Sequence, residues 1–196
     1  MKIVTRDFDV FDLERGDRCG GLMRRLTRHA LRRAALTGLR VTVTYSRGIS
    51  TRLSAGRCVV TCNHVSLLDG VIVALASPVP LVFAVDTEYS RQSDVAVRGL
   101  KALAWLGFGT VVPVDSGAPF GMRALLRAVA RGENVMVFPE GQISTTGSRG
   151  PDQAGLSWLL QRADARVVEL RIQGAEKSRL FAKRGQQWWP AIKLWF

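Results

Sequence analysis

From residue 40 onward, short runs of β-branched and other apolar residues alternate with stretches in which apolar positions recur every three or four residues. The apolar runs predict strands at Arg40–Tyr45, Arg57–Cys62, Leu81–Val85, Thr110–Val114, Asn134–Phe138, Arg166–Ile172 and Ala191–Phe196. The periodic stretches predict helices at Ser66–Ala76, Ser90–Leu106, Phe120–Ala130 and Gln153–Arg162. This alternation is typical of an α/β layered fold with a largely buried sheet. The chain has no internal repeat, low-complexity tract or linker, which favours one compact unit.

The segment Leu22–Leu39 has the pattern of an amphipathic helix that Gly38 is suited to end. Its apolar positions are Leu22, Met23, Leu26, Ala30, Leu31 and Ala34. Its other face is basic, with Arg24, Arg25, Arg28, Arg32 and Arg33, and no acidic residue lies between Leu22 and Arg40. Two interpretations stay open: a solvated helix packed on the core, or an interfacial helix that pairs its arginines with lipid phosphates. Residues 1–39 are therefore treated as a separate N-terminal segment.

The net charge of the chain favours some classes of binding partner over others. The sequence has 28 Lys and Arg against 16 Asp and Glu, a net charge of +12, which favours nucleic acid, anionic lipid or an acidic carrier protein. A nucleic-acid-binding domain is an alternative on charge alone. The sequence lacks the aromatic strand, zinc-finger spacing or helix-turn-helix glycine typical of such domains, so no nucleic acid is expected as a partner.

Three cysteines, Cys19, Cys58 and Cys62, form no C-x-x-C pair. On one strand Cys58 and Cys62 would lie about 13 Å apart, too far to bind the same ion. We therefore expect reduced thiols, and neither a disulfide framework nor a metal site.

No membrane-crossing segment is expected. Met1–Arg18 mixes acidic and basic residues without the apolar core of a signal peptide. The most apolar run, Gly70–Val85, is shorter than the roughly 18 residues of a spanning helix, and it is interrupted by Pro78 and Pro80. Attachment to a membrane surface remains compatible with the sequence.

His64 stands where the predicted strand Arg57–Cys62 passes into the next helix, a position at which α/β folds present chemistry. Asp69 follows about one helical turn later, within reach of an imidazole nitrogen. A carboxylate there would fix the tautomer and leave the other nitrogen as a base. Alternatively Asn63 and Ser66 are only capping residues, and His64 and Asp69 are ordinary polar groups, because the H-x-x-x-x-D spacing is common by chance.

A second candidate segment follows the predicted strand Asn134–Phe138. Pro139-Glu140-Gly141 leads into a loop rich in hydroxyl and backbone N–H donors, in which Gly141 and Gly147 permit close approach to an anion. An ordinary strand-ending turn is the alternative interpretation.

Taken together, N-H-V-S-L-L-D-G and F-P-E-G, about seventy residues apart and in that order, resemble the glycerolipid acyltransferase family, which includes 1-acylglycerol-3-phosphate O-acyltransferases. The resemblance extends from Val59 to Ala175. Further segments are similar to the acyltransferase portion of bacterial bifunctional 2-acylglycerophosphoethanolamine acyltransferase/acyl-carrier-protein synthetases: F-A-V at Phe83–Val85, R-G-L-K at Arg98–Lys101, V-P-V-D at Val112–Asp115, I-S-T-T-G at 143–147 and R-I-Q-G-A-E at Arg171–Glu176.

This resemblance implies a glycerol-3-phosphate acyltransferase-like layered fold, with a mostly parallel central sheet flanked by helices and residues 40–196 as the acyltransferase domain. It implies an O-acyltransferase in which His64, oriented by Asp69, deprotonates a lysophospholipid hydroxyl that attacks an acyl thioester. No metal or other cofactor is required. The residues expected at the substrate are Asn63, Ser66, Pro139, Glu140, Gly141, Gln142 and Arg149.

The partners implied are acyl-carrier protein or acyl-CoA as donor, a lysophospholipid acceptor, and an anionic membrane surface. The resemblance therefore predicts a peripheral protein at the cytoplasmic face of the inner membrane. Trp188 and Trp189 in the basic tail Lys183–Pro190 fit an interfacial surface, although core packing or simple exposure would place them equally well.

Two departures from the family pattern affect the acceptor. Gln142 and Ile143 occupy the positions at which family members carry an arginine, so Arg149 either replaces it or lies in a solvated loop. Glu169 stands where the family usually has proline, and it could repel a phosphate or pair with Arg171. A catalytically degenerate lysolipid-binding protein is therefore an alternative. A serine hydrolase is disfavoured because the sequence has no G-x-S-x-G.

Overall fold

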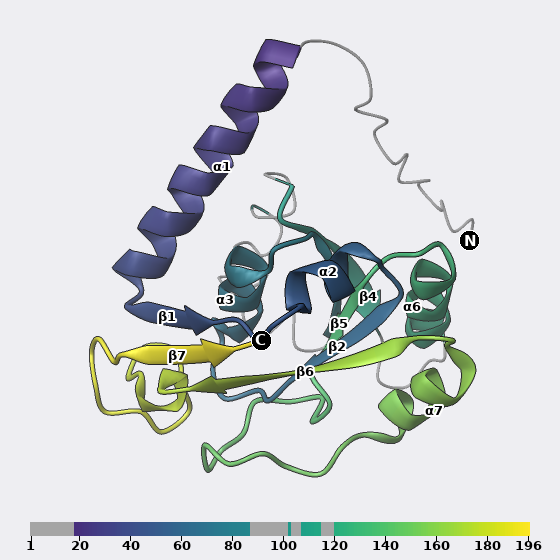
Figure 1. The fold of residues 1–196 in the computed structure, drawn as a ribbon. Helices are drawn as coiled ribbons and strands as arrows, with labels where there is room; N and C mark the ends of the chain where they lie inside the picture. The colour runs from purple at the N-terminus through teal and green to yellow at the C-terminus, as the bar shows by residue number, and fades with distance from the viewer. Residues whose placement is uncertain (1–17, 87–101, 103–106, 115–119) are drawn as a thin grey trace, which may run out of the picture.

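A computed structural model describes residues 18–86, 102, 107–114 and 120–196, and all structural statements refer to these. Seven strands form one sheet in the order β1-β7-β6-β2-β5-β3-β4 (Figure 1). The strands are β1 (Val41–Thr44), β2 (Cys58–Cys62), β3 (Leu81–Asp86), β4 (Gly109–Val114), β5 (Val135–Val137), β6 (Arg166–Gln173) and β7 (Ile192–Trp195). Every pair is parallel except β6 with β7. All seven predicted strands and the mostly parallel α/β architecture are confirmed.

The helices are α1 (Arg18–Gly38), α2 (Ile49–Ser54), α3 (Asp69–Ala76), α6 (Phe120–Ala130) and α7 (Ala154–Arg162), with a short 3-10 helix, η1 (Ala175–Lys177). Of the predicted helix Ser90–Leu106, only Ala102 lies within the described residues. The short helices α2 and η1 were not predicted. In α2 the signal is a single pair of apolar residues four apart, Ile49 and Leu53, both buried.

The prediction that a helix begins at Ser66 is wrong, because α3 begins at Asp69. The preceding residues form a turn around the Asp69 carboxylate, which accepts hydrogen bonds from the backbone N–H groups of Val65 and Ser66. Within this turn the Asp69 N–H donates to the Ser66 carbonyl three residues back, and the i to i−4 bonds of the helix begin with the Ile72 N–H and the Leu68 carbonyl.

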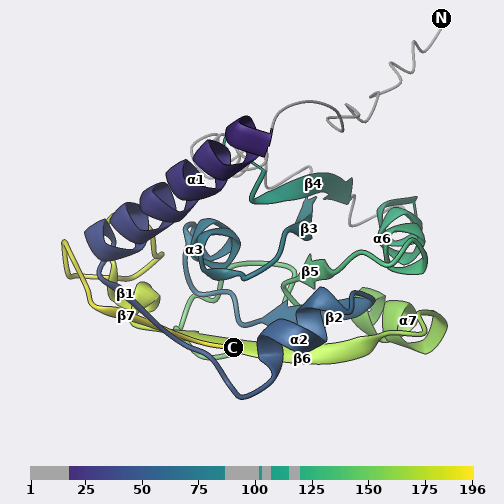
Figure 2. The same ribbon diagram turned by 45° about the horizontal axis from the view of Figure 1, so that its top comes forward.

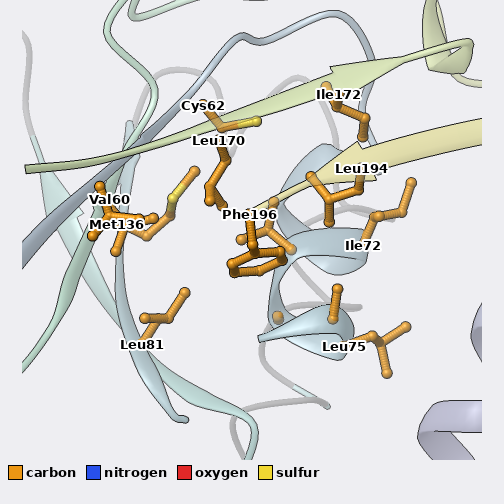
Figure 3. Close-up of a cluster of buried hydrophobic side chains, with 14 of the residues drawn as sticks. Val60, Cys62, Ile72, Leu75, Leu81, Met136, Leu170, Ile172, Leu194 and Phe196 are labelled. Atoms are coloured by element: carbon orange, nitrogen blue, oxygen red, sulfur yellow. The ribbon is translucent and has the colours of Figure 1, made fainter. Parts of the chain in front are cut away.

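Both faces of the sheet are buried at the central strands β2 and β5, whereas β6 alternates buried and exposed residues. Successive residues of β2 point to opposite faces, so Val60 packs in one cluster with α3, β6 and β7, and Val59 packs in another with α6 and α7. Figure 3 shows part of the first cluster, in which Met136 and Leu170 lie on the same side of the sheet as Ile72. Truncation of such fully buried side chains typically lowers the free energy of unfolding by about 2–5 kcal/mol. This layer therefore fixes α3 against β2.

Helix α1 lies beside α3 and β1 at its C-terminal end (Figures 1 and 2). Leu36 packs against the core, whereas Leu31 is 39% exposed. Two arginines of the basic face contact the protein: Arg28 lies 6.0 Å from the ring centroid of Phe108, and Arg32 donates to the carbonyl of Ala76 at 2.5 Å. The basic face is therefore partly used to attach the helix. Within the described ranges, no helix combines the length and the apolar character needed to cross a bilayer.

Candidate active site

The two candidate motifs meet because of the strand order. His64 follows the carboxyl end of β2, and Glu140 follows the carboxyl end of β5. Strands β2 and β5 are parallel neighbours, with Thr61 opposite Val137. Carboxyl ends of parallel strands lie at the same edge of a sheet, and ligands bind there in open α/β folds.

At this edge His64 and Asp69 are in contact. The distance between His64 Nδ1 and Asp69 Oδ2 is 3.0 Å. The side chain of Asp69 is fully buried, whereas that of His64 is 12% exposed, so the imidazole reaches the surface. An ionised carboxylate can only accept hydrogen bonds, so the contact places the proton of a neutral ring on Nδ1 and leaves Nε2 as the basic nitrogen.

The buried carboxylate of Asp69 is held by further donors. Its Oδ2 accepts from the backbone N–H groups of Val65, at 2.6 Å, and Ser66, at 2.7 Å. Its Oδ1 accepts from the hydroxyl of Ser66 at 2.5 Å. A buried charge is tolerated when its acceptors are satisfied in this way, and the same bonds fix the direction in which the carboxylate faces the imidazole.

Glu140 joins the two motif loops. Its Oε1 accepts from the backbone N–H of His64 at 3.0 Å, and its Oε2 accepts from the backbone N–H of Gly150 at 3.0 Å. Glu140 is only 4% exposed. The backbone N–H of Ser144 donates to the His64 carbonyl at 2.8 Å, and the ring of Phe138 stacks on the imidazole with centroids 4.1 Å apart. The loop after β5 therefore positions the loop that carries His64.

Asn63 holds the strand-to-helix junction and does not cap α3. Its side-chain amide donates to the Ile172 carbonyl at 2.9 Å and accepts from the Ile172 N–H at 2.8 Å. This paired contact ties the residue after β2 to the backbone of β6.

The residues around Glu140 have distinct environments. Pro139 is buried and its carbonyl accepts from the Gln153 N–H at 2.7 Å, whereas Gln142 is exposed. Gly141 has a φ of 68°, and a Cβ there would lie 3.1 Å from Gln153 Cγ. A larger residue at this position would thus be strained by its backbone and crowded by Gln153.

The two departures from the family pattern have structural counterparts. Ile143 is 4% exposed, so this position points into the interior. Arg149 donates to Glu169 Oε1 at 2.5 Å and to Asp152 Oδ1 at 3.0 Å, and the hydrogen bonds to Asp152 and then to Glu169 raise the pKa of the Arg149 guanidinium. Glu169 thus pairs with Arg149, not with the Arg171 suggested as one possible partner. Arg149 is in an exposed ion-pair network, not a free solvated side chain.

The thiol beside the site is not a nucleophile in this setting. Cys62 is buried, and burial, followed by the nearby charge of Asp69, raises its pKa well above the ordinary value. Nucleophilic attack by cysteine needs the thiolate, which such a thiol does not form at neutral pH. In the described part of the chain, no three His, Cys, Asp or Glu side chains gather in a way that could hold a metal ion.

A separate pocket of about 290 Å³ lies at the other edge of the sheet, where the amino ends of the strands meet. Its lining includes Gly56 before β2, Leu81 at the start of β3 and Asn134 before β5. Because the strands are parallel, this pocket and His64 lie at opposite edges, so it is not part of the candidate site.

Five of the predicted site residues lie close together in the structure: His64, Asp69, Asn63, Ser66 and Glu140. Sequence reasoning had not named Phe138, Ser144 or Gly150 as site residues. Phe138 belongs to the F-P-E-G motif, so a signal existed. Gly150 carries no local signal, because only the fold brings its N–H to the Glu140 carboxylate.

Comparison with known proteins identifies a family and a shared fold. The acyltransferase family is matched over residues 40–173, a range that contains both motifs. Among solved structures, the chain is similar to the crystal structure of the 1-acyl-sn-glycerophosphate (LPA) acyltransferase, PlsC, from Thermotoga maritima. The TM-score is 0.60 and the sequence identity 18%, over 91% of this chain and 71% of that chain. At this identity the likeness shows a shared fold. Since the family match covers more than half of the chain, the protein belongs to the acyltransferase family.

Proposed function

We propose that the protein transfers a fatty acyl group from an acyl thioester to the free hydroxyl of a lysophospholipid, in glycerophospholipid synthesis or remodelling. The observation that carries this proposal is the contact between His64 and the buried, fully hydrogen-bonded carboxylate of Asp69, within a chain of the acyltransferase family. The 3.0 Å contact suits a base that must remove a proton from an alcohol of very low acidity.

In the proposed reaction, Nε2 of His64 removes the hydroxyl proton as the acceptor oxygen attacks the thioester carbonyl. The new C–O bond produces a tetrahedral oxyanion and an imidazolium, which the Asp69 carboxylate stabilises. Collapse of the oxyanion breaks the C–S bond, and the departing thiolate takes the proton from the imidazolium. The attack is direct, because Cys62 is a buried protonated thiol and the Ser66 hydroxyl donates to Asp69.

The remaining site residues are proposed to shape the acceptor pocket. Asn63 and Ser66 keep the His64 loop in place, and Pro139, Glu140, Gly141 and Gln142 form its neighbouring wall. Arg149 is proposed to meet the acceptor phosphate, since it is the first cation after the Glu140 motif in the sequence and is 43% exposed at its side chain. Its two carboxylate partners then orient the guanidinium before the acceptor arrives.

The donor is an acyl-carrier-protein or coenzyme A thioester. Both are anionic, which complements the net charge of +12. The similarity to the acyltransferase portion of bifunctional acyltransferase/acyl-carrier-protein synthetases makes the carrier-protein thioester the first donor to test.

The reaction is proposed to take place at the cytoplasmic face of the inner membrane, with the protein peripheral. In this proposal residues 1–39 are the membrane-surface segment and 40–196 the catalytic domain. The exposed Leu31 and Arg33 of α1 support such a role, although Arg28 and Arg32 are already in contact with the protein.

A panel of acyl-carrier-protein and coenzyme A thioesters offered with different lysophospholipids tests the proposal, with release of free thiol as the readout. We expect acceptor-dependent thiol release that His64→Ala abolishes, while the circular dichroism spectrum and the melting temperature remain those of a folded protein. The matched control is His29→Ala, which removes the other histidine, an exposed residue of α1. Equal turnover by His64→Ala and the wild type would refute the assignment.

A lysolipid-binding protein without turnover is the second candidate. The specific observation that favours it is the engagement of Arg149 by Glu169 and Asp152, together with the buried Ile143 at the usual arginine position. Saturable lysolipid binding without thiol release from any donor in the panel would support this function instead.

A further inference from the structure

The segment between η1 and β7, residues 178–191, exposes three large apolar side chains. Leu180 is 50% exposed, Trp188 61% and Trp189 55%. Single exposed apolar residues are normal on protein surfaces, but three within one short loop form a candidate contact surface.

This loop is well tied down by its own backbone. Arg179 N–H donates to the Gln187 carbonyl at 2.8 Å, and Gln187 N–H donates to the Lys177 carbonyl at 2.8 Å. A Cβ at Gly185 would lie 2.0 Å from the Ser178 carbonyl oxygen, so the two sides of the loop approach as closely as only glycine allows. The exposure of the tryptophans is therefore a property of a defined loop conformation.

Both indoles are held in place by polar contacts. The guanidinium of Arg179 lies 4.6 Å from the ring centroid of Trp188. The Trp189 indole N–H donates to the Gly38 carbonyl at the end of α1 at 2.9 Å, and Arg40 donates to the Trp189 carbonyl at 2.9 Å. The loop and α1 are thus adjacent, as Figure 1 shows at the lower end of the helix.

The segment that carries the indoles contains positively charged side chains and no negatively charged ones. From residue 177 to the last residue the sequence contains no Asp or Glu, and its cations are Lys177, Arg179, Lys183, Arg184 and Lys193. All five are exposed. An anionic partner would thus meet no opposing carboxylate from this segment.

The loop also contacts the catalytic loop directly. The Phe181 carbonyl accepts from the backbone N–H of Leu67 at 2.8 Å. Leu67 lies between His64 and Asp69 in the sequence, so one hydrogen bond connects the tryptophan loop to the turn that orients the imidazole.

We propose that Leu180, Trp188 and Trp189, with Arg179, Lys183 and Arg184, form a docking surface for the headgroup layer of an anionic phospholipid membrane, and that this surface sets the His64 loop beside that layer. The exposed indole rings suit this layer because it accommodates apolar aromatic surface beside polar groups, while each cation meets a lipid phosphate. An acidic protein would be matched by the cations, but the paired indoles and Leu180 favour lipid. The placement of the His64 loop beside the lipid layer rests on the proposed function.

The test measures binding of the full chain to vesicles of phosphatidylcholine with and without phosphatidylglycerol, by co-sedimentation and by quenching of tryptophan fluorescence with brominated lipids. Trp188→Ala/Trp189→Ala is expected to weaken binding to anionic vesicles by about tenfold or more, because two indoles leave the interface. Arg179→Glu is expected to weaken it by a similar factor, since one cation near an anionic surface contributes about fivefold and the introduced carboxylate is repelled. Circular dichroism checks that both variants fold.

The matched control is Arg162→Glu. Arg162 lies over the ring of Trp158 at 4.7 Å on α7, so it is also a guanidinium stacked on an indole, but outside the proposed surface. Its substitution is expected to leave vesicle binding within twofold of the wild type. Equal losses in Arg179→Glu and Arg162→Glu would mean that only net charge matters, and would overturn the proposal. So would unchanged vesicle binding by the folded variants, or a loss confined to binding of acidic acyl-carrier protein.

Activity assays distinguish a failure of the docking surface from a failure of the proposed function. The surface variants are expected to lose activity on acceptors embedded in vesicles and to keep it on a monomeric, short-chain lysophospholipid. If vesicle binding depends on Trp188 and Trp189 but no acyl transfer is detected, the proposed function is refuted and the docking surface is supported. Full activity on vesicle-embedded acceptors in the double variant would overturn the docking surface and leave the function.

Discussion

At the scale of single residues, the proposed chemistry depends on Asp69. Its carboxylate is fully buried and accepts from three protein donors in addition to the imidazole contact. The same side chain ends the turn after β2 and begins α3, so one residue has both a structural and a proposed chemical role.

Replacing Asp69 by Asn is therefore expected to lower kcat/KM by about 10²–10⁴-fold, because an amide neither stabilises the imidazolium nor holds the required tautomer. Steady-state kinetics against the wild type measures the effect. The control is Asp164→Asn, whose carboxylate is fully solvent-exposed. A kcat/KM within threefold of the wild type in a folded Asp69→Asn variant would contradict the proposed role.

The buried thiols predict a loss of stability in alkaline solution. Burial raises the pKa of both Cys58 and Cys62. Above about pH 8.5, the ordinary thiol value, the unfolded chain releases these protons while the folded chain retains them, so the free energy of unfolding falls as pH rises. The slope is at most about 1.4 kcal/mol per pH unit for each thiol.

Urea denaturation between pH 7 and pH 10 measures this slope. Cys62→Ala is expected to be less stable than the wild type at pH 7, because it leaves a cavity, and to lose stability less steeply above pH 8.5. Parallel pH profiles for the two proteins would show that Cys62 is not responsible for the alkaline loss.

At the scale of elements, the site results from the adjacency of β2 and β5. Glu140 connects the loops that follow these two strands, because its two carboxylate oxygens accept hydrogen bonds from the backbone N–H groups of His64 and Gly150. A glutamine has only one acceptor oxygen, so one N–H, that of His64 or Gly150, would face an amide NH₂ group.

Glu140→Gln is accordingly expected to lower the free energy of unfolding by about 1–3 kcal/mol, the usual cost of a buried donor left unsatisfied, and to lower turnover with it. Denaturant unfolding and thiol-release assays give the two readouts. Glu133→Gln is the control, since Glu133 forms an exposed pair with Arg131 that is worth about 0–1 kcal/mol. Similar small losses in both variants would mean that Glu140 does not organise the loops.

At the scale of the whole molecule, the contacts of α1 decide how this helix sits on the rest of the fold. Arg32 donates to the Ala76 carbonyl at the end of α3 and to the Tyr45 hydroxyl, which itself donates to the same carbonyl at 2.6 Å. These contacts join α1, α3 and the residue after β1.

We expect Arg32→Ala to cost about 1 kcal/mol of stability, the typical value of such a hydrogen bond, and to speed hydrogen exchange in α1. Mass spectrometry of deuterated peptides from residues 27–38 measures the exchange. Arg33→Ala, the exposed neighbour, is the matched control and is expected to change neither quantity. Equal exchange rates in the two variants would show that Arg32 does not attach the helix.

The sequence by itself determined where the strands lie along the chain, and it indicated that His64 and Asp69 belong together. Both depend on short-range information: β-branched runs reveal strands, and five residues of chain cannot separate an imidazole from a carboxylate by much. Short-range pattern was less successful at the start of α3, where residues 66–68 form a turn and the helix begins only at Asp69.

Only the tertiary structure decided the contacts between distant segments. The Glu140 carboxylate meets the His64 N–H across 76 positions of sequence, and Arg149 meets Glu169 across 20. These contacts follow from the sheet order, in which β5 and β6 flank β2. Strand order results from the packing of the whole chain, which no local period of hydrophobic residues encodes.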